Sequence, residues 1–303
     1  MLATDRSSLA GMVAMAEANG LKLAYDEAGV PGAEVVLLIA GTGQHRTFWP
    51  EEIVDGLVRA GYRVIRADNR DIGQSSWLDD LGPPDFAAIM SRTKPAPYGV
   101  ADMAADQVGL LDALAIEKAH VVGLSLGGIV AQTMAADSPS RVASLVSIMS
   151  TTGNAELPRS RGDVFSARMA PVGPSIEDAV EATYAFEQLV ASPSFAQDDE
   201  RLRARLRAEA EFDHPEGVQR QVVAMLTAGD RRAALSGITA PTVVLHGDSD
   251  PVAPLECGQD TATAIPGAEM RIVEGMGHDL PPQLASTVID AVLTAAARSD
   301  ART

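Results

Sequence analysis

The pattern of apolar and polar positions predicts a chain of alternating strands and helices. Residues 35–40 are apolar at every position, which is typical of a strand buried on both faces of a parallel sheet. Apolar runs near 13–14 and 21–24 flank Asn19-Gly20, a dipeptide that favours a tight turn between antiparallel strands. Further strands are expected at 62–68, 121–122, 142–148, 242–246 and 270–273, and helices at 50–60, 100–116, 129–136, 254–264 and 282–297. This alternation predicts right-handed crossovers and a parallel sheet.

The alternation of strands and helices stops between residues 154 and 237, where no buried strand is predicted. Residues 199–211 mix acids and bases at helical separations, which is typical of a solvated helix face with i,i+4 pairs. We therefore expect an α/β core formed by residues 1–153 and 238–303. Its mostly parallel, doubly wound sheet would carry a helical lid inserted at 154–237.

Composition narrows the class of protein. The 303 residues, 46% of them hydrophobic, suffice for one large domain with an insertion. A formal net charge of −17 argues against nucleic acid and anionic membrane surfaces as partners. No apolar run reaches the length of a membrane span. The single cysteine, Cys257, excludes an internal disulfide, is expected at a packed helix start and is compatible with a cytoplasmic location.

The N-terminal residues resemble a signal peptide only in part. A short apolar stretch covers residues 9–15, but Asp5 offsets Arg6, so the positive region of a signal peptide is missing. We expect a loose extension, with Met12 and Met15 as alternative starts.

Ser125 lies in the most informative segment, Gly123-Leu124-Ser125-Leu126-Gly127. An apolar strand precedes it and a helical pattern follows it, so Gly-x-Ser-x-Gly falls on a sharp turn. A strained turn needs neighbours without side chains, and this arrangement is typical of a nucleophile elbow. The alternative, a glycine-rich loop with an idle serine, is disfavoured by the strand–turn–helix context.

A serine nucleophile needs a base, usually a histidine held by a carboxylate. Five histidines are available. His278 is the favoured base, because it follows the last predicted strand in a loop with two preceding glycines. His120 is interpreted as structural, His246 as packing or support, His214 as a surface residue of the lid, and His45 as lining the mouth of the site.

Two aspartates compete for the third position, Asp248 and Asp250, both just after the strand at 242–246. Asp248 is expected to shape the turn through backbone bonds. Asp250 precedes Pro251 and is our choice for the triad. The chain order is then serine, aspartate, histidine.

The charge on a tetrahedral oxygen must be met by fixed donors. We expect the backbone N–H groups of Leu126 and Thr42 to form this oxyanion hole, with the Thr42 hydroxyl as a further donor. Candidate substrate contacts are Gly41, Gly43 and His45 near the turn, and Phe165, Met169, Tyr184 and Phe186 in the lid. The lid residues, with Phe212, fit a roomy apolar pocket and an ordinary lid core equally well. No metal-ligand spacing, phosphate loop or dinucleotide motif is present, so neither a metal nor a cofactor is expected.

Two further segments are finer markers: Trp49-Pro50-Glu51 and residues 64–76, which contain an Asp-x-Arg-Asp-x-Gly-x-Ser loop. With the serine, aspartate and histidine, they make the chain similar to the α/β-hydrolase superfamily over nearly its full length. Within it, the chain resembles carboxylesterases of the aclacinomycin methylesterase type. The resemblance implies the α/β-hydrolase fold, a triad at Ser125, Asp250 and His278, and a bracing role for the Asp68, Arg70 and Gly73 loop.

The resemblance also implies cleavage of a small-molecule ester, sizeable and largely neutral, such as a polyketide methyl ester. Two positions depart from the family pattern: Ala40-Gly41 stands where many relatives have His-Gly, and Leu124 stands where polar or aromatic residues are common. Three other reactions fit the same triad, those of a lactonase, a C–C bond hydrolase and a perhydrolase. A ligand receptor with vestigial turnover is the alternative from a different class.

Overall fold

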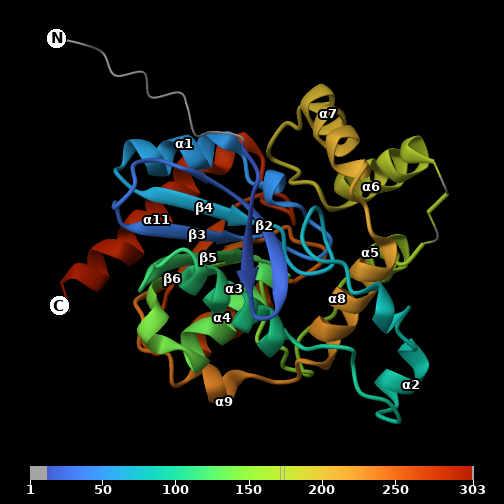
Figure 1. The fold of residues 1–303 in the computed structure, drawn as a ribbon. Helices are drawn as coiled ribbons and strands as arrows, with labels where there is room; N and C mark the ends of the chain where they lie inside the picture. The colour runs from blue at the N-terminus through green and yellow to red at the C-terminus, as the bar shows by residue number, and fades with distance from the viewer. Residues whose placement is uncertain (1–11, 171, 174, 302–303) are drawn as a thin grey trace.

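The computed structural model describes residues 12–170, 172–173 and 175–301, and it contains one eight-stranded sheet in the order β1-β2-β4-β3-β5-β6-β7-β8 (Figure 1). The strands are β1 (Ala14–Ala18), β2 (Leu21–Ala28), β3 (Val35–Ile39), β4 (Arg63–Ala67), β5 (Ala119–Leu124), β6 (Val142–Ile148), β7 (Thr242–Gly247) and β8 (Glu269–Val273). Strand β2 pairs antiparallel with β1 and β4, and all other pairs are parallel. The predicted α/β class is confirmed.

The β1–β2 hairpin turns at the expected dipeptide. Asn19 and Gly20 both have positive φ, 51° and 77°. A two-residue hairpin loop needs this conformation, because it matches the twist of the strands. Residues 1–11 of the expected N-terminal extension lie outside the described residues.

Helices cover both faces of the sheet (Figure 1). On one face, α1 (Glu51–Arg59) and α11 (Ala285–Asp300) pack against each other and against the apolar side chains of β3 to β7. On the other face lie α3 (Val100–Ala113) and α4 (Leu126–Asp137), with α9 (Arg232–Leu235) and α10 (Leu255–Ala264) beside them. Cys257 is buried near the start of α10, as expected. The central strands are therefore buried on both sides, which explains their unbroken apolar runs.

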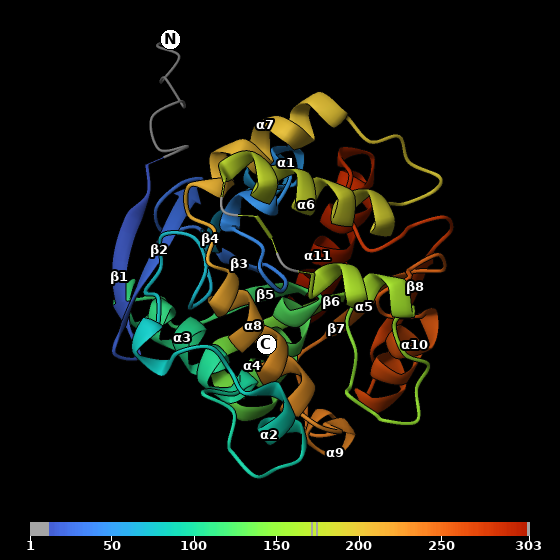
Figure 2. The same cartoon turned by 90° about the vertical axis from the view of Figure 1, so that its right-hand side faces the viewer.

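Between β6 and β7 the described chain forms helices and no strand: α5 (Gly162–Arg168), α6 (Ile176–Val190), α7 (Asp199–Ala210), α8 (Pro215–Thr227) and α9. We refer to α5–α8 as the helical insertion. In Figure 2, α6 and α7 lie side by side, apart from the sheet. The charged α7 is not wholly solvated, because Leu202, Leu206 and Glu209 are buried. The shorter helices are η1 (Arg46–Phe48), η2 (Asp79–Leu81), α2 (Phe86–Met90), η3 (Pro139–Arg141) and η4 (Pro282–Leu284).

Helix α8 is tied to the core by a buried ion pair. Arg220 of α8 donates from Nε and Nη2 to the two carboxylate oxygens of Asp71, at 2.9 and 2.8 Å. Both side chains are fully buried. Breaking such a pair from one side leaves an uncompensated charge and costs about 3–5 kcal/mol. The stability of the core therefore depends on α8, which supplies Arg220 to this pair.

The prediction that His214 is a surface residue is wrong. Its ring is buried, stacks on Trp77 with centroids 4.3 Å apart, and lies 2.8 Å from Asp79 Oδ1. The physical reason is that a polar ring can be buried when distant residues supply its hydrogen bonds. Within the described residues, no helix is long and apolar enough to cross a membrane.

Candidate active site

Ser125 occupies a one-residue turn between β5 and α4. Its φ of 52° and ψ of −120° place a non-glycine residue in a strained region of the backbone. The turn is tight enough that a Cβ at Gly123 would lie 2.1 Å from the carbonyl oxygen of Gly127. The Ser125 N–H donates to Ile148 O at 2.9 Å, which anchors the turn to β6. The glycines on either side are therefore required by contact with the backbone.

His278 links the serine to an aspartate. Its Nε2 lies 3.0 Å from Ser125 Oγ, and its Nδ1 lies 2.7 Å from Asp250 Oδ2. His278 follows β8, and its backbone N–H donates to the carbonyl oxygen of Val190 at the end of α6. The structure thus brings Ser125, His278 and Asp250 into one hydrogen-bonded line, although they are widely spaced in sequence.

Backbone hydrogen bonds to Oδ1 fix the orientation of the Asp250 carboxylate. Asp250 Oδ1 accepts the N–H groups of Val252 at 2.8 Å and Ala253 at 2.9 Å, and this leaves Oδ2 for His278. His246 Nε2 lies 3.7 Å from the same Oδ2 and donates to Ala253 O at 2.7 Å. Burial lowers the pKa of His246, so this imidazole stays neutral beside the aspartate.

Asp248 has a different environment. It is exposed, and its Oδ1 accepts the N–H of Gly275 at 2.7 Å and the hydroxyl of Ser249 at 3.0 Å. These bonds join the loop after β7 to the loop after β8. Asp248 therefore holds the loop that carries His278, while Asp250 contacts the imidazole itself.

The turn at Gly41-Thr42-Gly43 faces the serine. A Cβ at Gly41 would lie 3.2 Å from Ser125 Cβ. The Gly41 N–H donates to Gln44 Oε1 and the Gly43 N–H to Gln221 Oε1, both at 2.8 Å. Among the described residues, the Thr42 N–H has no acceptor. The Leu126 N–H opens α4 and belongs to the amides that a helix leaves unpaired.

Residues of the helical insertion hold this turn in place. Arg168 Nη2, at the end of α5, donates to Thr42 O at 2.5 Å. The Arg168 guanidinium lies over the Phe186 ring, 5.1 Å from its centroid. Burial lowers the pKa of Arg168, and the charges of Glu187 and Asp213 oppose that effect. The sequence analysis missed Arg168, because its partner is a backbone carbonyl 126 residues away.

The other predicted substrate contacts have mixed surroundings. His45 is buried, with Nε2 3.7 Å from Asp213 Oδ1. Tyr184 packs against a small core of the helical insertion formed by Val180, Leu202 and Leu206. Phe165 is 48% exposed, and Met169 is half-buried. None of the seven predicted contacts lines the cavity of about 230 Å³ that lies between the helical insertion and the core.

No metal centre is found in the part of the chain that the structure describes. There, no three His, Cys, Asp or Glu side chains lie close enough together to hold a metal ion. What the site does contain is a hydroxyl, an imidazole and a carboxylate in line, beside two backbone donors. This arrangement can activate the hydroxyl as a nucleophile and stabilise a developing oxyanion.

Comparison with known proteins adds independent information. A family model described as alpha/beta hydrolase fold matches residues 34–282. The chain is 32% identical to rhodomycin D methylesterase DnrP of Streptomyces peucetius, over 84% of this chain and 87% of the relative. It is 31% identical to a 2-hydroxy-6-oxononadienedioate/2-hydroxy-6-oxononatrienedioate hydrolase of Cupriavidus pinatubonensis, over 82% and 81% of the two chains. The crystal structure of a hydrolase from Pseudomonas aeruginosa PA01 superimposes with a TM-score of 0.71 at 27% identity, covering 94% of this chain and 98% of the other.

Proposed function

The chain belongs to the α/β-hydrolase family, and from this premise we propose that it is a serine hydrolase that cleaves a carboxylic ester through an acyl-enzyme. The observation that carries the proposal is the hydrogen-bonded line Ser125–His278–Asp250. A serine hydroxyl is a weak nucleophile until a positioned base takes its proton. His278 is the base within reach, and Asp250 fixes its orientation.

In the first half of the reaction, Ser125 Oγ attacks the ester carbonyl carbon while its proton passes to His278 Nε2. The carbonyl oxygen becomes an oxyanion. The Leu126 N–H and the Thr42 N–H are the donors without other acceptors on either side of the serine, so we assign them to this oxyanion. Collapse of the tetrahedral intermediate breaks the ester C–O bond, and His278 gives its proton to the departing alkoxide.

In the second half, water replaces the alcohol. His278 takes a proton from the water as its oxygen attacks the acyl carbon of the acyl-enzyme. The second tetrahedral intermediate collapses, the acid leaves, and the proton returns through His278 to Ser125 Oγ. Asp250 stabilises the imidazolium in both halves and keeps the proton of the neutral imidazole on Nδ1.

For the substrate, we propose a methyl ester of a bulky, largely neutral small molecule. The relative from Streptomyces peucetius is named as a methylesterase, and a net charge of −17 disfavours anionic substrates. Residues 154–237 would act as a lid, because Arg168 and Gln221 reach from it to the turn beside the serine. A cytoplasmic location is consistent with the single buried cysteine, Cys257.

An activity screen with a matched variant tests the proposal. The protein and its Ser125→Ala variant are assayed on p-nitrophenyl acetate, on aryl and methyl esters, on lactones and on a vinylogous diketone for C–C cleavage. We expect turnover of methyl and aryl esters that is lost in the variant. If the protein turned over only lactones it would be a lactonase, and if it turned over only the diketone it would be a C–C bond hydrolase; either result would overturn the esterase assignment. Thermal stabilisation by a ligand without turnover of any substrate would favour a receptor.

A further inference from the structure

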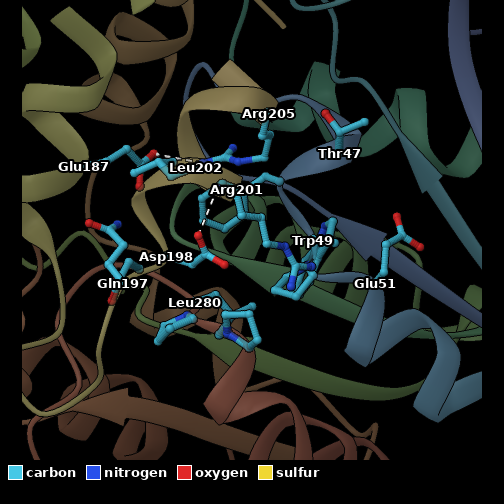
Figure 3. Close-up of a pocket in the computed structure, with 15 residues that line it drawn as sticks. Thr47, Trp49, Glu51, Glu187, Gln197, Asp198, Arg201, Leu202, Arg205 and Leu280 are labelled. Atoms are coloured by element: carbon cyan, nitrogen blue, oxygen red, sulfur yellow. Dashed lines mark hydrogen bonds and ion pairs between the residues drawn. The ribbon is translucent and has the colours of Figure 1, made fainter. Parts of the chain in front are cut away.

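The helical insertion meets the loop that carries His278 at one edge of a cavity of about 230 Å³ (Figure 3). We call residues 191–198, between α6 and α7, the α6–α7 linker, and residues 274–281, between β8 and η4, the histidine loop. Both segments contribute residues to the lining of the cavity. They therefore lie beside each other, although more than 70 residues separate them in the sequence.

The helical insertion approaches the histidine loop so closely that two loop positions have no room for a side chain. A Cβ at Gly277 would lie 2.5 Å from the carbonyl oxygen of Val190, and a Cβ at Gly275 would overlap Ser194 Oγ. The backbone N–H of Ser194 donates to Gly275 O at 3.2 Å. The two glycines before His278 therefore allow a close contact with the helical insertion.

Ser192 joins two parts of the histidine loop. Its hydroxyl oxygen accepts the backbone N–H of Gly277 at 2.8 Å, and the hydroxyl donates to Asp279 Oδ1. The backbone N–H of Ser192 donates to the same Oδ1 at 3.0 Å. These bonds reach the residue before His278 and the residue after it, and the backbone N–H of His278 donates to Val190 O at 2.8 Å. The helical insertion therefore holds the loop on both sides of the imidazole.

The side chains of Ser192 and Asp279 are shielded from water. Ser192 is 4% exposed and Asp279 is 5% exposed. Burial raises the pKa of Asp279, and the bonds from Ser192 oppose this effect only in part. In either protonation state one carboxyl oxygen can accept both bonds. The contact therefore needs an acceptor oxygen at position 279, and an amide would also supply one.

The core holds a different part of the histidine loop. Asp248 Oδ1 accepts the N–H of Gly275 at 2.7 Å, and Met276 O accepts the N–H of Ser249 at 3.1 Å. These bonds fix residues 275 and 276, whereas the bonds from the helical insertion fix residues 277–279. The placement of the imidazole is therefore shared between the core and the helical insertion.

This placement matters because the imidazole has to reach two partners at once. His278 Nε2 lies 3.0 Å from Ser125 Oγ, and His278 Nδ1 lies 2.7 Å from Asp250 Oδ2. A misplacement of about 1 Å can cost about 10²-fold in rate, because proton transfer requires reacting groups that are already oriented.

We propose that Ser192 and Asp279 are positioning residues for the base, through which the helical insertion places His278 against Ser125. The inference rests on the proposed function, because His278 is the base of that mechanism. It gives the helical insertion a role in addition to that of a lid. Proton transfer at Ser125 depends on a segment that lies outside the α/β core.

Ser192→Ala tests this inference directly. The change removes the hydroxyl that joins Gly277 to Asp279 and keeps the backbone bond to Oδ1. With p-nitrophenyl acetate we expect kcat to fall about ten- to a hundredfold with KM nearly unchanged, because His278 acts in both halves of the reaction. Ser194→Ala is the matched control. It removes an exposed hydroxyl from the same linker and should leave kcat and KM unchanged.

Asp279 offers a rescue experiment. Asp279→Ala removes the acceptor, and kcat should fall by about as much as in Ser192→Ala. Asp279→Asn keeps an oxygen for Ser192, so its kcat should stay within about threefold of the parent value. In the double Ala variant the two losses should not add, because the two side chains share one set of bonds. If circular dichroism shows that Asp279→Ala is unfolded, Ser192→Ala and Asp279→Asn carry the test.

Amide hydrogen exchange measures the contact without turnover. The backbone amides of Gly277 and His278 should exchange at least about tenfold faster in Ser192→Ala than in the parent protein, because the loop then opens more often. They should exchange at the parent rate in Ser194→Ala. Together with kcat, this measurement separates positioning of the base from a purely structural contact.

Four results would overturn the inference: an unchanged kcat in Ser192→Ala, a change confined to KM, an Asp279→Asn variant as slow as Asp279→Ala, or faster exchange without slower turnover. Each of them would leave serine-dependent ester hydrolysis standing. Failure of the proposed function looks different. If the parent protein turns over only lactones or the diketone, the esterase assignment falls, and the same order of variants on that substrate supports the inference.

Discussion

Replacement of Asp250 by asparagine is the sharpest perturbation of the hydrogen-bonded line. Asp250 Oδ1 accepts two backbone N–H groups, from Val252 and Ala253. An asparagine would keep its carbonyl oxygen on these donors and turn its NH₂ group toward His278 Nδ1. That nitrogen must then be an acceptor, so the imidazole proton moves to Nε2, which faces Ser125 Oγ at 3.0 Å. Because Nε2 then carries a proton, it cannot accept the proton of the Ser125 hydroxyl.

The expected cost follows from this change of tautomer. In serine proteases the equivalent Asp→Asn change leaves the geometry intact and lowers kcat by about 10⁴, which corresponds to about 5 kcal/mol of transition-state stabilisation. We expect a loss of about 10² to 10⁴ in kcat for Asp250→Asn. The fold should survive, because the two backbone bonds to Oδ1 are kept.

Asp248→Asn is the matched control. Its amide oxygen can still accept the Gly275 N–H, so kcat should fall by less than about tenfold. Both variants are checked by circular dichroism and then assayed with p-nitrophenyl acetate. If the Asp248 variant is inactive and the Asp250 variant retains its rate, the tautomer argument is refuted and the acid is misassigned.

Three further predictions concern the serine, the turn beside it and a buried histidine. Ser125→Ala should lose at least about a thousandfold in kcat while staying folded, and a fluorophosphonate should label only Ser125 in the parent protein; labelling of another serine would contradict the assignment. Arg168→Gln removes the charge-assisted bond to Thr42 O, so kcat should fall about tenfold with KM nearly unchanged; a change confined to KM would mean that Arg168 binds substrate instead. Burial lowers the pKa of His45, but carboxylates led by Asp213 outweigh burial and raise it above the ordinary value. His45 therefore contributes a stabilisation that is complete below about pH 6.5 and is lost as the pH rises through the raised pKa. Urea midpoints of the parent and of His45→Gln should differ most near pH 5.5, and the difference should shrink as the pH rises through the raised pKa; a gap that stays constant would disprove the linkage.

The sequence predicted the parts of the molecule that local patterns determine. The all-apolar run at 35–40 became the central strand β3, because a parallel strand buried on both faces needs apolar side chains on both. Gly-x-Ser-x-Gly became the turn between β5 and α4, because only glycine fits the close backbone approach. Ser125, Asp250 and His278 could be singled out because each follows a strand that ends at the same edge of the sheet.

Contacts between distant charged residues could not be predicted in this way. The interpretation of His214 as exposed followed from its polarity, yet Asp79 and the Asp71 carbonyl supply its bonds from over 130 residues away. Glu187 and Arg168 look like residues of a solvated helix, although Glu187 is buried and the guanidinium of Arg168 reaches Thr42 O. A single sequence shows which residues carry charge, but it does not show which charges meet after folding.

The buried pair between Asp71 and Arg220 has a consequence for how such enzymes diverge. If α8 were exchanged or deleted, Asp71 would remain buried without its counter-charge, at a cost of about 3–5 kcal/mol. That is a large share of the 5–15 kcal/mol that keeps a typical domain folded. Recombinants between relatives should therefore fold when the exchanged segment ends before α8. They should fail to fold when the exchange replaces Arg220 but leaves its partner Asp71 in place. Mutations in α5, α6 and α7 can then change the substrate range, while α8 stays under selection for folding.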